Sequence, residues 1–212
     1  RAPSPHCHRC PLAMSYPSCG CAGAHMLEQA FAKQVNAGEV AAVIAEPVQG
    51  EGGFIVPPPE YMGIIKKMCE KHGILLIADE IQTGMGRTGK WFAMEHWGVE
   101  PDIMTTAKAL GAGFPITGIT GRQEIMDAAH PSGVGSTVGG NPLGRRAGVA
   151  VICTLEGAGG GERAGERMGS TEGERESVRC RTETEGGEPA ETRRKASSVH
   201  QWRAWRVVRT LR

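Results

Sequence analysis

The chain has 212 residues, 40% of them hydrophobic, and a formal net charge of +1, which fits one globular domain with a sizeable core. A nearly balanced charge creates no field over the whole protein that would attract nucleic acid or an anionic membrane, so we expect neither as a partner. No apolar run reaches the ~20 residues that span a bilayer, and residues 1–11 lack the apolar stretch of a secretory signal. We therefore expect a cytoplasmic protein.

Residues 1–23 have no helical or alternating pattern and are predicted to form a connecting loop. The chain has seven cysteines, an odd number, and four of them crowd into this loop. Neither feature is typical of a secreted disulfide framework, so we expect reduced thiols. The ligand types also suit zinc: the set is Cys7, Cys10, Cys19 and Cys21, with His6 and His8 nearby. An alternative interpretation is therefore a small zinc-binding structural or interaction module, although Cys19-x-Cys21 lacks the usual two-residue spacing.

Helix and strand signals alternate over residues 24–156, which we assign to one partial domain. The first helix is predicted from apolar residues at helical spacing that end at Gly38, namely Met26, Leu27, Ala30, Phe31 and Val35. The continuously apolar run 40–45 follows and predicts a strand buried on both faces of a parallel sheet. Glu46 and Pro47 end this strand.

A second helix is predicted after residues 57–60, with one apolar face and a stop at Gly73. The remaining predicted elements are strands at 74–78, 103–106 and 116–119 and a helix at 123–129. Strands and helices in this order indicate an α/β fold with a mainly parallel sheet. Ligands bind beyond the carboxyl ends of the strands in such sheets, and Glu46, Asp79 and Lys108 lie at those ends.

The stretch 157–212 loses this periodicity and is rich in Gly, Arg, Glu, Ser and Thr. It has too few aliphatic residues to offset its ordering entropy, so we expect a disordered, low-complexity tail. Its basic, Trp-containing end at 202–206 is expected to be solvated rather than bound to a partner.

Several segments together resemble the signature of the class III pyridoxal-phosphate-dependent aminotransferases. The signature segments are 75–89, which contains Asp79-Glu80-Ile81-Gln82, then Pro101-Asp102-Ile103 and Lys108-Ala109-Leu110-Gly111. Segments 45–53 and 135–142 continue the likeness at the same order and approximate spacing. The opening loop is similar to the connecting loop of the 4-aminobutyrate (ω-amino acid) branch, where no metal is implied.

The resemblance implies the central part of the large domain of a fold-type I transferase, with pyridoxal 5'-phosphate as cofactor. It implies transfer of an amino group from an amino acid, such as an ω-amino acid, to a 2-oxo acid. Lys108 would hold the cofactor as a Schiff base and serve as general base and acid. Asp79 would keep the ring nitrogen protonated, Ile81 would pack on the ring, and Gln82 would hydrogen-bond its phenolic oxygen.

The remaining matched residues concern substrate and phosphate. Glu46 resembles the acidic residue of the substrate pocket, while Ser136 and Thr137 match residues that bind the cofactor phosphate. The family's Thr137 counterpart does so from the neighbouring subunit, which implies a homodimer. Val138 stands where an aromatic residue is common.

The likeness ends after residue 156, and that end limits what this chain is expected to do. The family's phosphate loop would precede residue 1, and no arginine for the substrate carboxylate can be assigned after residue 156. We therefore expect a truncated chain with an unrelated tail, of the kind an out-of-frame translation would give. Such a chain should be inactive by itself.

Overall fold

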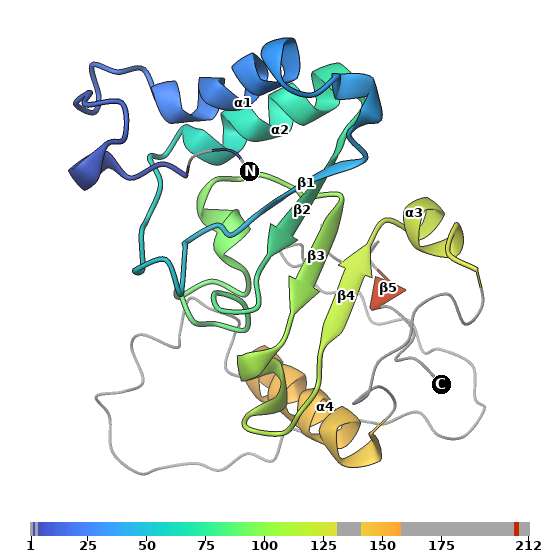
Figure 1. Cartoon of the computed structure of the whole chain (residues 1–212). Helices are drawn as coiled ribbons and strands as arrows, with labels where there is room; N and C mark the ends of the chain where they lie inside the picture. The colour runs from blue at the N-terminus through green and yellow to red at the C-terminus, as the bar shows by residue number, and fades with distance from the viewer. Residues whose placement is uncertain (1, 3, 131–140, 158–205, 208–212) are drawn as a thin grey trace, which may run out of the picture.

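The computed structural model describes residues 2, 4–130 and 141–157 and the backbone of 206–207 (Figure 1). Its helices are α1 (Ala22–Lys33), α2 (Tyr61–His72), α3 (Gln123–Asp127) and α4 (Pro142–Gly157), and its strands are β1 (Ala42–Ala45), β2 (Leu75–Asp79), β3 (Ile103–Thr106), β4 (Gly118–Gly121) and β5 (Arg206–Val207). The 3-10 helices are η1 (Cys7–Arg9), η2 (Ala37–Glu39), η3 (Ala93–His96) and η4 (Lys108–Gly111).

The strands form one sheet in the order β1-β2-β3-β4-β5. β1, β2 and β3 run parallel, with Val43 opposite Leu76 and Ala78 opposite Met104. β4 and β5 are antiparallel to their neighbours. The expected α/β fold with a mainly parallel sheet is confirmed, with an antiparallel region at one edge.

One apolar core joins the helix layer to one face of the sheet. α1 and α2 lie side by side in Figure 1, and their buried residues meet those of the strands: Ala24, Met62, Ile65, Cys69, Leu76, Ala78 and Met104. α2 ends at Gly73, whose φ of 68° is in the left-handed region that glycine adopts without strain. The second helix and its stop are therefore confirmed.

The first helix is shorter than predicted. It ends at Lys33, where the N–H groups of Gln34 and Val35 both donate to the Ala30 carbonyl. Asn36 then accepts from the Gly38 N–H and starts a separate 3-10 turn, since Asn competes with the helix for backbone donors. Val35 is 46% exposed, so its assignment to the buried helical face is wrong.

Two strand predictions also need correction. β1 is not buried on both faces: only Val43 and Ala45 pack on the core, while Ile44 is 61% exposed on the opposite face. The apolar run indicated full burial because the sequence pattern does not reveal that β1 is an edge strand of the described sheet. The strand predicted at 116–119 begins at Gly118 instead.

Ile116, outside that strand, packs against α4, which contacts η4 below the carboxyl edge of the sheet (Figure 1). A Cβ on Gly144 of α4 would lie 2.9 Å from the Pro115 carbonyl oxygen. A side chain there would push the helix away, so Gly144 permits this close packing.

Within the described residues, no helix combines the length and apolar character needed to cross a bilayer. The tail predicted to be disordered lies, apart from Gly157 and the 206–207 backbone, outside the described residues.

Candidate active site

The parallel strands β1, β2 and β3 all end at the lower edge of the sheet in Figure 1. Glu46 follows β1 directly, Asp79 is the last residue of β2, and Lys108 follows β3 by two residues. The parallel register therefore brings three residues that are far apart in sequence to one edge, as the order of elements predicted.

The Asp79 carboxylate is held by two donors and is half-buried. Its Oδ1 accepts from the Ile81 N–H at 3.1 Å and from the Thr105 hydroxyl of β3 at 3.3 Å. Oδ2 accepts no hydrogen bond from the residues that the structure describes. One oxygen is thus fixed, while the other remains available at the edge.

Lys108 lies at the start of η4 and is exposed. Its ammonium group donates to the Gln82 Oε1. Its φ of 41° falls in the left-handed region, which costs about 1–3 kcal/mol for a residue other than glycine and is found most often at functional sites. The fold therefore keeps Lys108 in a strained conformation that directs its amine toward Gln82.

Gln82 and Glu46 meet at Gly50. The Gly50 N–H donates to the Glu46 Oε2 at 2.7 Å, and a Cβ on Gly50 would lie 3.0 Å from the Gln82 Cγ. A side chain at position 50 would displace Gln82, so this close approach requires glycine. Glu46, Gln82 and Lys108 thus form one continuous set of contacts.

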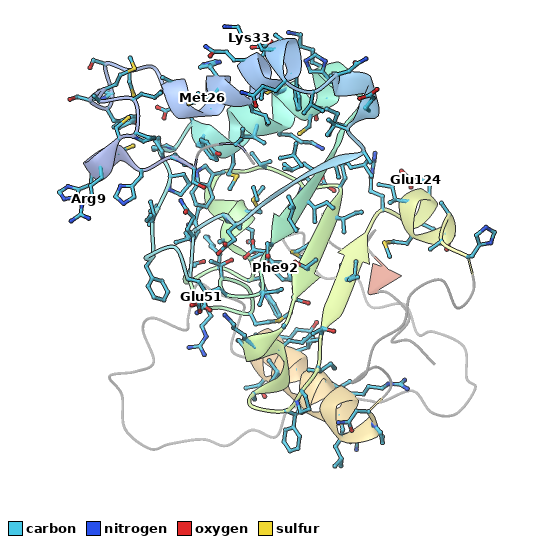
Figure 2. All side chains as sticks on the ribbon, in the orientation of Figure 1. Arg9, Met26, Lys33, Glu51, Phe92 and Glu124 are labelled. Atoms are coloured by element: carbon cyan, nitrogen blue, oxygen red, sulfur yellow. The ribbon has the colours of Figure 1, made fainter. Side chains whose placement is uncertain are left out.

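The loop beyond Gly50 is closed at its base. The N–H groups of Gln49 and Ile55 donate to each other's carbonyls at 3.0 and 3.1 Å. Residues 51–54 between them are exposed, and Figure 2 shows the labelled Glu51 on this outer part of the loop. The tip is joined to Gly50, whose carbonyl accepts from the Gly53 and Phe54 N–H groups at 3.0 and 3.2 Å.

Ile81 is half-buried, and its backbone N–H contacts Asp79, while its role on the cofactor ring remains a prediction. Ser136, Thr137 and Val138 lie outside the described residues.

Glu80 was quoted in the signature, but the sequence interpretation gave it no role. It is 1% exposed and accepts from the Thr83 hydroxyl and from the Met94 N–H at 2.8 Å. Burial raises its pKa, partly opposed by these hydrogen bonds. The carboxyl group fastens the segment that carries Ile81 and Gln82 to η3. Strand alternation could have revealed it, because Leu76, Ala78 and Glu80 share the buried face.

Asp102 was quoted in the signature without a role, and it lies at the opposite edge of the sheet. Its carboxylate accepts from the Leu76 N–H at 2.8 Å and forms ion pairs of 3.1 Å with Lys66 and Arg122. This network joins α2, β2 and the end of β4. Its charges are already paired, which indicates a structural function.

The zinc alternative gains no support from the structure. Across residues 4–130 and 141–157, no three His, Cys, Asp or Glu side chains are grouped to hold a metal ion. The His6 Nδ1 instead accepts from the Arg9 N–H at 3.0 Å and caps η1.

Known proteins resemble this chain over the same residues. The sequence profile of the family Aminotransferase class-III matches residues 4–166. The leucine/methionine racemase of Thermococcus litoralis is 49% identical over 154 residues, which cover 73% of this chain and 35% of the relative. The 4-aminobutyrate aminotransferase GabT of Escherichia coli is 51% identical over 118 residues, covering 56% and 28%.

A solved amine transaminase from an uncultivated Pseudomonas species, in its PLP-bound form, has a TM-score of 0.67 and 39% identity, covering 74% of this chain and 37% of that one. This chain thus spans between 28% and 37% of the lengths of these three relatives. With the profile matched over most of its residues, and with Glu46, Asp79 and Lys108 at one sheet edge, the chain belongs to the class III aminotransferases.

Proposed function

We propose that the complete protein transfers an amino group from an amino acid to a 2-oxo acid, with pyridoxal 5'-phosphate bound at the carboxyl edge of the sheet. The observation that carries the proposal is the contact of the Lys108 ammonium group with Gln82, next to the fixed carboxylate of Asp79. An amine and a carboxylate on adjacent strand ends are the two groups that this cofactor requires.

The residues present fit the cofactor. Lys108 is exposed, so its amine can reach the cofactor aldehyde, and the free Oδ2 of Asp79 can accept the ring N–H. When bound, the cofactor supplies an electron sink that stabilises negative charge at the substrate carbon. Asp79, held by Thr105, keeps the ring nitrogen protonated.

Each matched residue then has a defined task. Lys108 would hold the cofactor through its amine and would serve as the general base and acid that moves the proton of the substrate carbon. Gln82 orients the Lys108 Nζ and hydrogen-bonds the phenolic oxygen, while Ile81 packs on the ring. Glu46, fixed by the Gly50 N–H, borders the substrate.

The proposal extends to assembly and location. Ser136 binds the cofactor, and Thr137 reaches the cofactor phosphate of the partner subunit in a homodimer, which makes activity depend on dimerisation. The protein acts in the cytoplasm. Cross-linking and cell fractionation would test these two points separately from the chemistry.

We propose an ω-amino acid such as 4-aminobutyrate as the amino donor. The GabT relative, with 51% identity, supports this substrate class. A second candidate activity is amino-acid racemisation, favoured by 49% identity over 154 residues to the leucine/methionine racemase. Racemisation uses the same lysine, because it removes and returns a proton at one substrate carbon.

The test uses two proteins: the 212-residue chain and a version extended at both ends with the corresponding GabT segments. Each is assayed with cofactor, 4-aminobutyrate, ornithine or alanine, and 2-oxoglutarate or pyruvate. The extended protein should turn over on the order of 1 per second, while the chain alone should not. Conversion of L-leucine to D-leucine without amino transfer would favour the racemase instead, and no reaction with any donor would refute both.

A further inference from the structure

The opening loop brings several thiols together at one place. Cys7, Cys10, Cys19 and Cys21 line a single shallow pocket, and sulfur atoms of this loop are visible beside α1 in Figure 2. The pKa of Cys7 is raised by desolvation and then by the neighbouring thiols of Cys19 and Cys10. Cys7 is therefore within electrostatic reach of both.

A single 3-10 turn joins Cys7 to Cys10, its C-cap residue. The two residues between them belong to the 3-10 helix η1. Side chains three positions apart in a 3-10 helix lie above one another, with a rise of about 6 Å. The Cα atoms of a disulfide are usually about 4.4–6.8 Å apart, so no rearrangement of the turn is needed.

Cys19 is held near the same turn by the rest of the loop. Tyr16 donates from its hydroxyl to the Glu60 carboxylate at 3.2 Å, which anchors the loop on the residue before α2. The Cys19 N–H donates to the Ser15 carbonyl at 2.9 Å, so a backbone hydrogen bond holds Cys19 to the residue before Tyr16. The ordered loop thus presents two thiols to Cys7.

The other described thiols are placed differently. Cys21 is buried at the start of α1, and Cys69 is buried in the core, where desolvation raises its pKa to about 11. Cys7 is exposed, and Cys10 and Cys19 are half-exposed. A dissolved oxidant reaches these three thiols first.

We propose that Cys7, Cys10 and Cys19 form a redox site in which Cys7 makes a reversible disulfide with Cys10 or Cys19 when a small disulfide such as oxidised glutathione is present. The Cys7 thiolate attacks one sulfur of the small disulfide and releases one thiolate. The Cys10 or Cys19 thiolate then attacks the Cys7 Sγ and releases the second thiolate. Two protein thiols lose two electrons, one small disulfide gains them, and the two protein protons end on the two released thiols.

The test is peptide mapping of the whole 212-residue chain after treatment with oxidised glutathione, acid quenching, alkylation and tryptic digestion without reduction. Trypsin cleaves after Arg9 and Lys33, so Cys7 lies in peptide 2–9 and the other loop cysteines lie in peptide 10–33. The two peptides should appear joined by a disulfide, and prior treatment with dithiothreitol should separate them. Cys69 should remain unoxidised as an internal control.

Variants identify the partner of Cys7. The double change Cys10→Ser with Cys19→Ser should reduce the joined peptides at least about tenfold, while the matched control Cys21→Ser should leave them unchanged. In urea the joined peptides should form about tenfold more slowly, because the folded loop holds the thiols together. Absence of the joined peptides, their persistence in the double variant, or equal rates in urea and buffer would each overturn the proposal, which does not depend on the activity proposed above.

Discussion

At the amino edge of the sheet, the Asp102 carboxylate is 9% exposed and bonds to Lys66, Arg122 and the Leu76 N–H. At the carboxyl edge, Lys108 is exposed, has a left-handed backbone and contacts the neutral amide of Gln82. The Asp102 carboxylate pairs with two cations, whereas the Lys108 ammonium group contacts an amide. Removing one partner of a buried, paired charge destabilises a fold, whereas an exposed amine on strained backbone is available for chemistry. The comparison teaches that pairing, more than charge, distinguishes the two edges.

Among changes at the two edges, Lys108→Ala is expected to have the largest effect on function. In the extended protein the change should remove covalent cofactor attachment, its visible absorption band and activity by more than about 10⁴-fold, because both attachment and proton transfer depend on this amine. Absorption spectra and turnover measure this. Lys108→Gly is the matched control: it should be equally inactive but more stable than Lys108→Ala by about 1 kcal/mol, because glycine relieves the positive φ. An active Lys108→Ala variant would disprove the assignment.

Asp79→Asn should reduce turnover by about 10²- to 10³-fold while the cofactor stays attached to Lys108. The Asn Oδ1 can still accept from Ile81 and Thr105, so the fold should not change. The ring nitrogen, however, loses its ionic partner. Single-turnover kinetics with a deuterated substrate would locate the loss in proton transfer, and unchanged turnover would mean that another acid serves the ring.

At the opposite edge, Asp102→Ala should lower the free energy of unfolding by about 3 kcal/mol, because it leaves Lys66, Arg122 and a buried N–H without their acceptor. Urea unfolding measures the change. The matched control is Glu70→Ala, since its pair with Lys66 spans 3.7 Å and Glu70 is 60% exposed. That change should cost at most about 0.5 kcal/mol, and equal losses in both variants would contradict the structural role of Asp102.

The smallest effect is expected at Glu80, whose buried carboxyl group is neither paired with a cation among the described residues, as Asp102 is, nor exposed, as Lys108 is. The pKa of Glu80 is raised in the folded state, so the folded state binds the proton of Glu80 more tightly than the unfolded state does. This proton binding stabilises the fold fully below the pKa of the unfolded state, and the stabilisation is lost as pH rises through the pKa of the folded state. The stability of the native chain relative to Glu80→Gln should therefore fall as pH rises from below about 4 to about 7. Unfolding curves at several pH values measure it, and a difference that rises with pH would reverse the sign and refute this account.

The sequence predicted those elements whose boundaries depend on local signals. α2 and β3 were predicted because Gly73 supplies the helix stop and because residues 103–106 form a short strand pattern. The end of α1 was not predicted, because it depends on competition from Asn36. The exposure of Ile44 was not predicted either, because it depends on which strand lies at the edge of the sheet. These are tertiary properties that a local pattern does not contain.

The candidate site shows the same limit. The residues Glu46, Gln82 and Lys108 came from the resemblance, and their contacts are now described. The role of Gly50 in placing Gln82 and the anchoring by Glu80 depend on side chains that meet across distant segments. A motif lists such residues without saying what they touch.

The closed base of the loop at Gln49 and Ile55 has a consequence for protein engineering. Because the two mutual backbone hydrogen bonds hold the loop base, and the N–H groups of Gly53 and Phe54 donate to the Gly50 carbonyl, substitutions of the exposed side chains of Glu51 and Phe54 should leave Glu46, Gly50 and Gln82 in place. Phe54, 71% exposed, already shows that the tip needs no packing partner among the described residues. The tip is therefore a region where a library of varied side chains at constant loop length could be screened for altered substrate range without rebuilding the cofactor site.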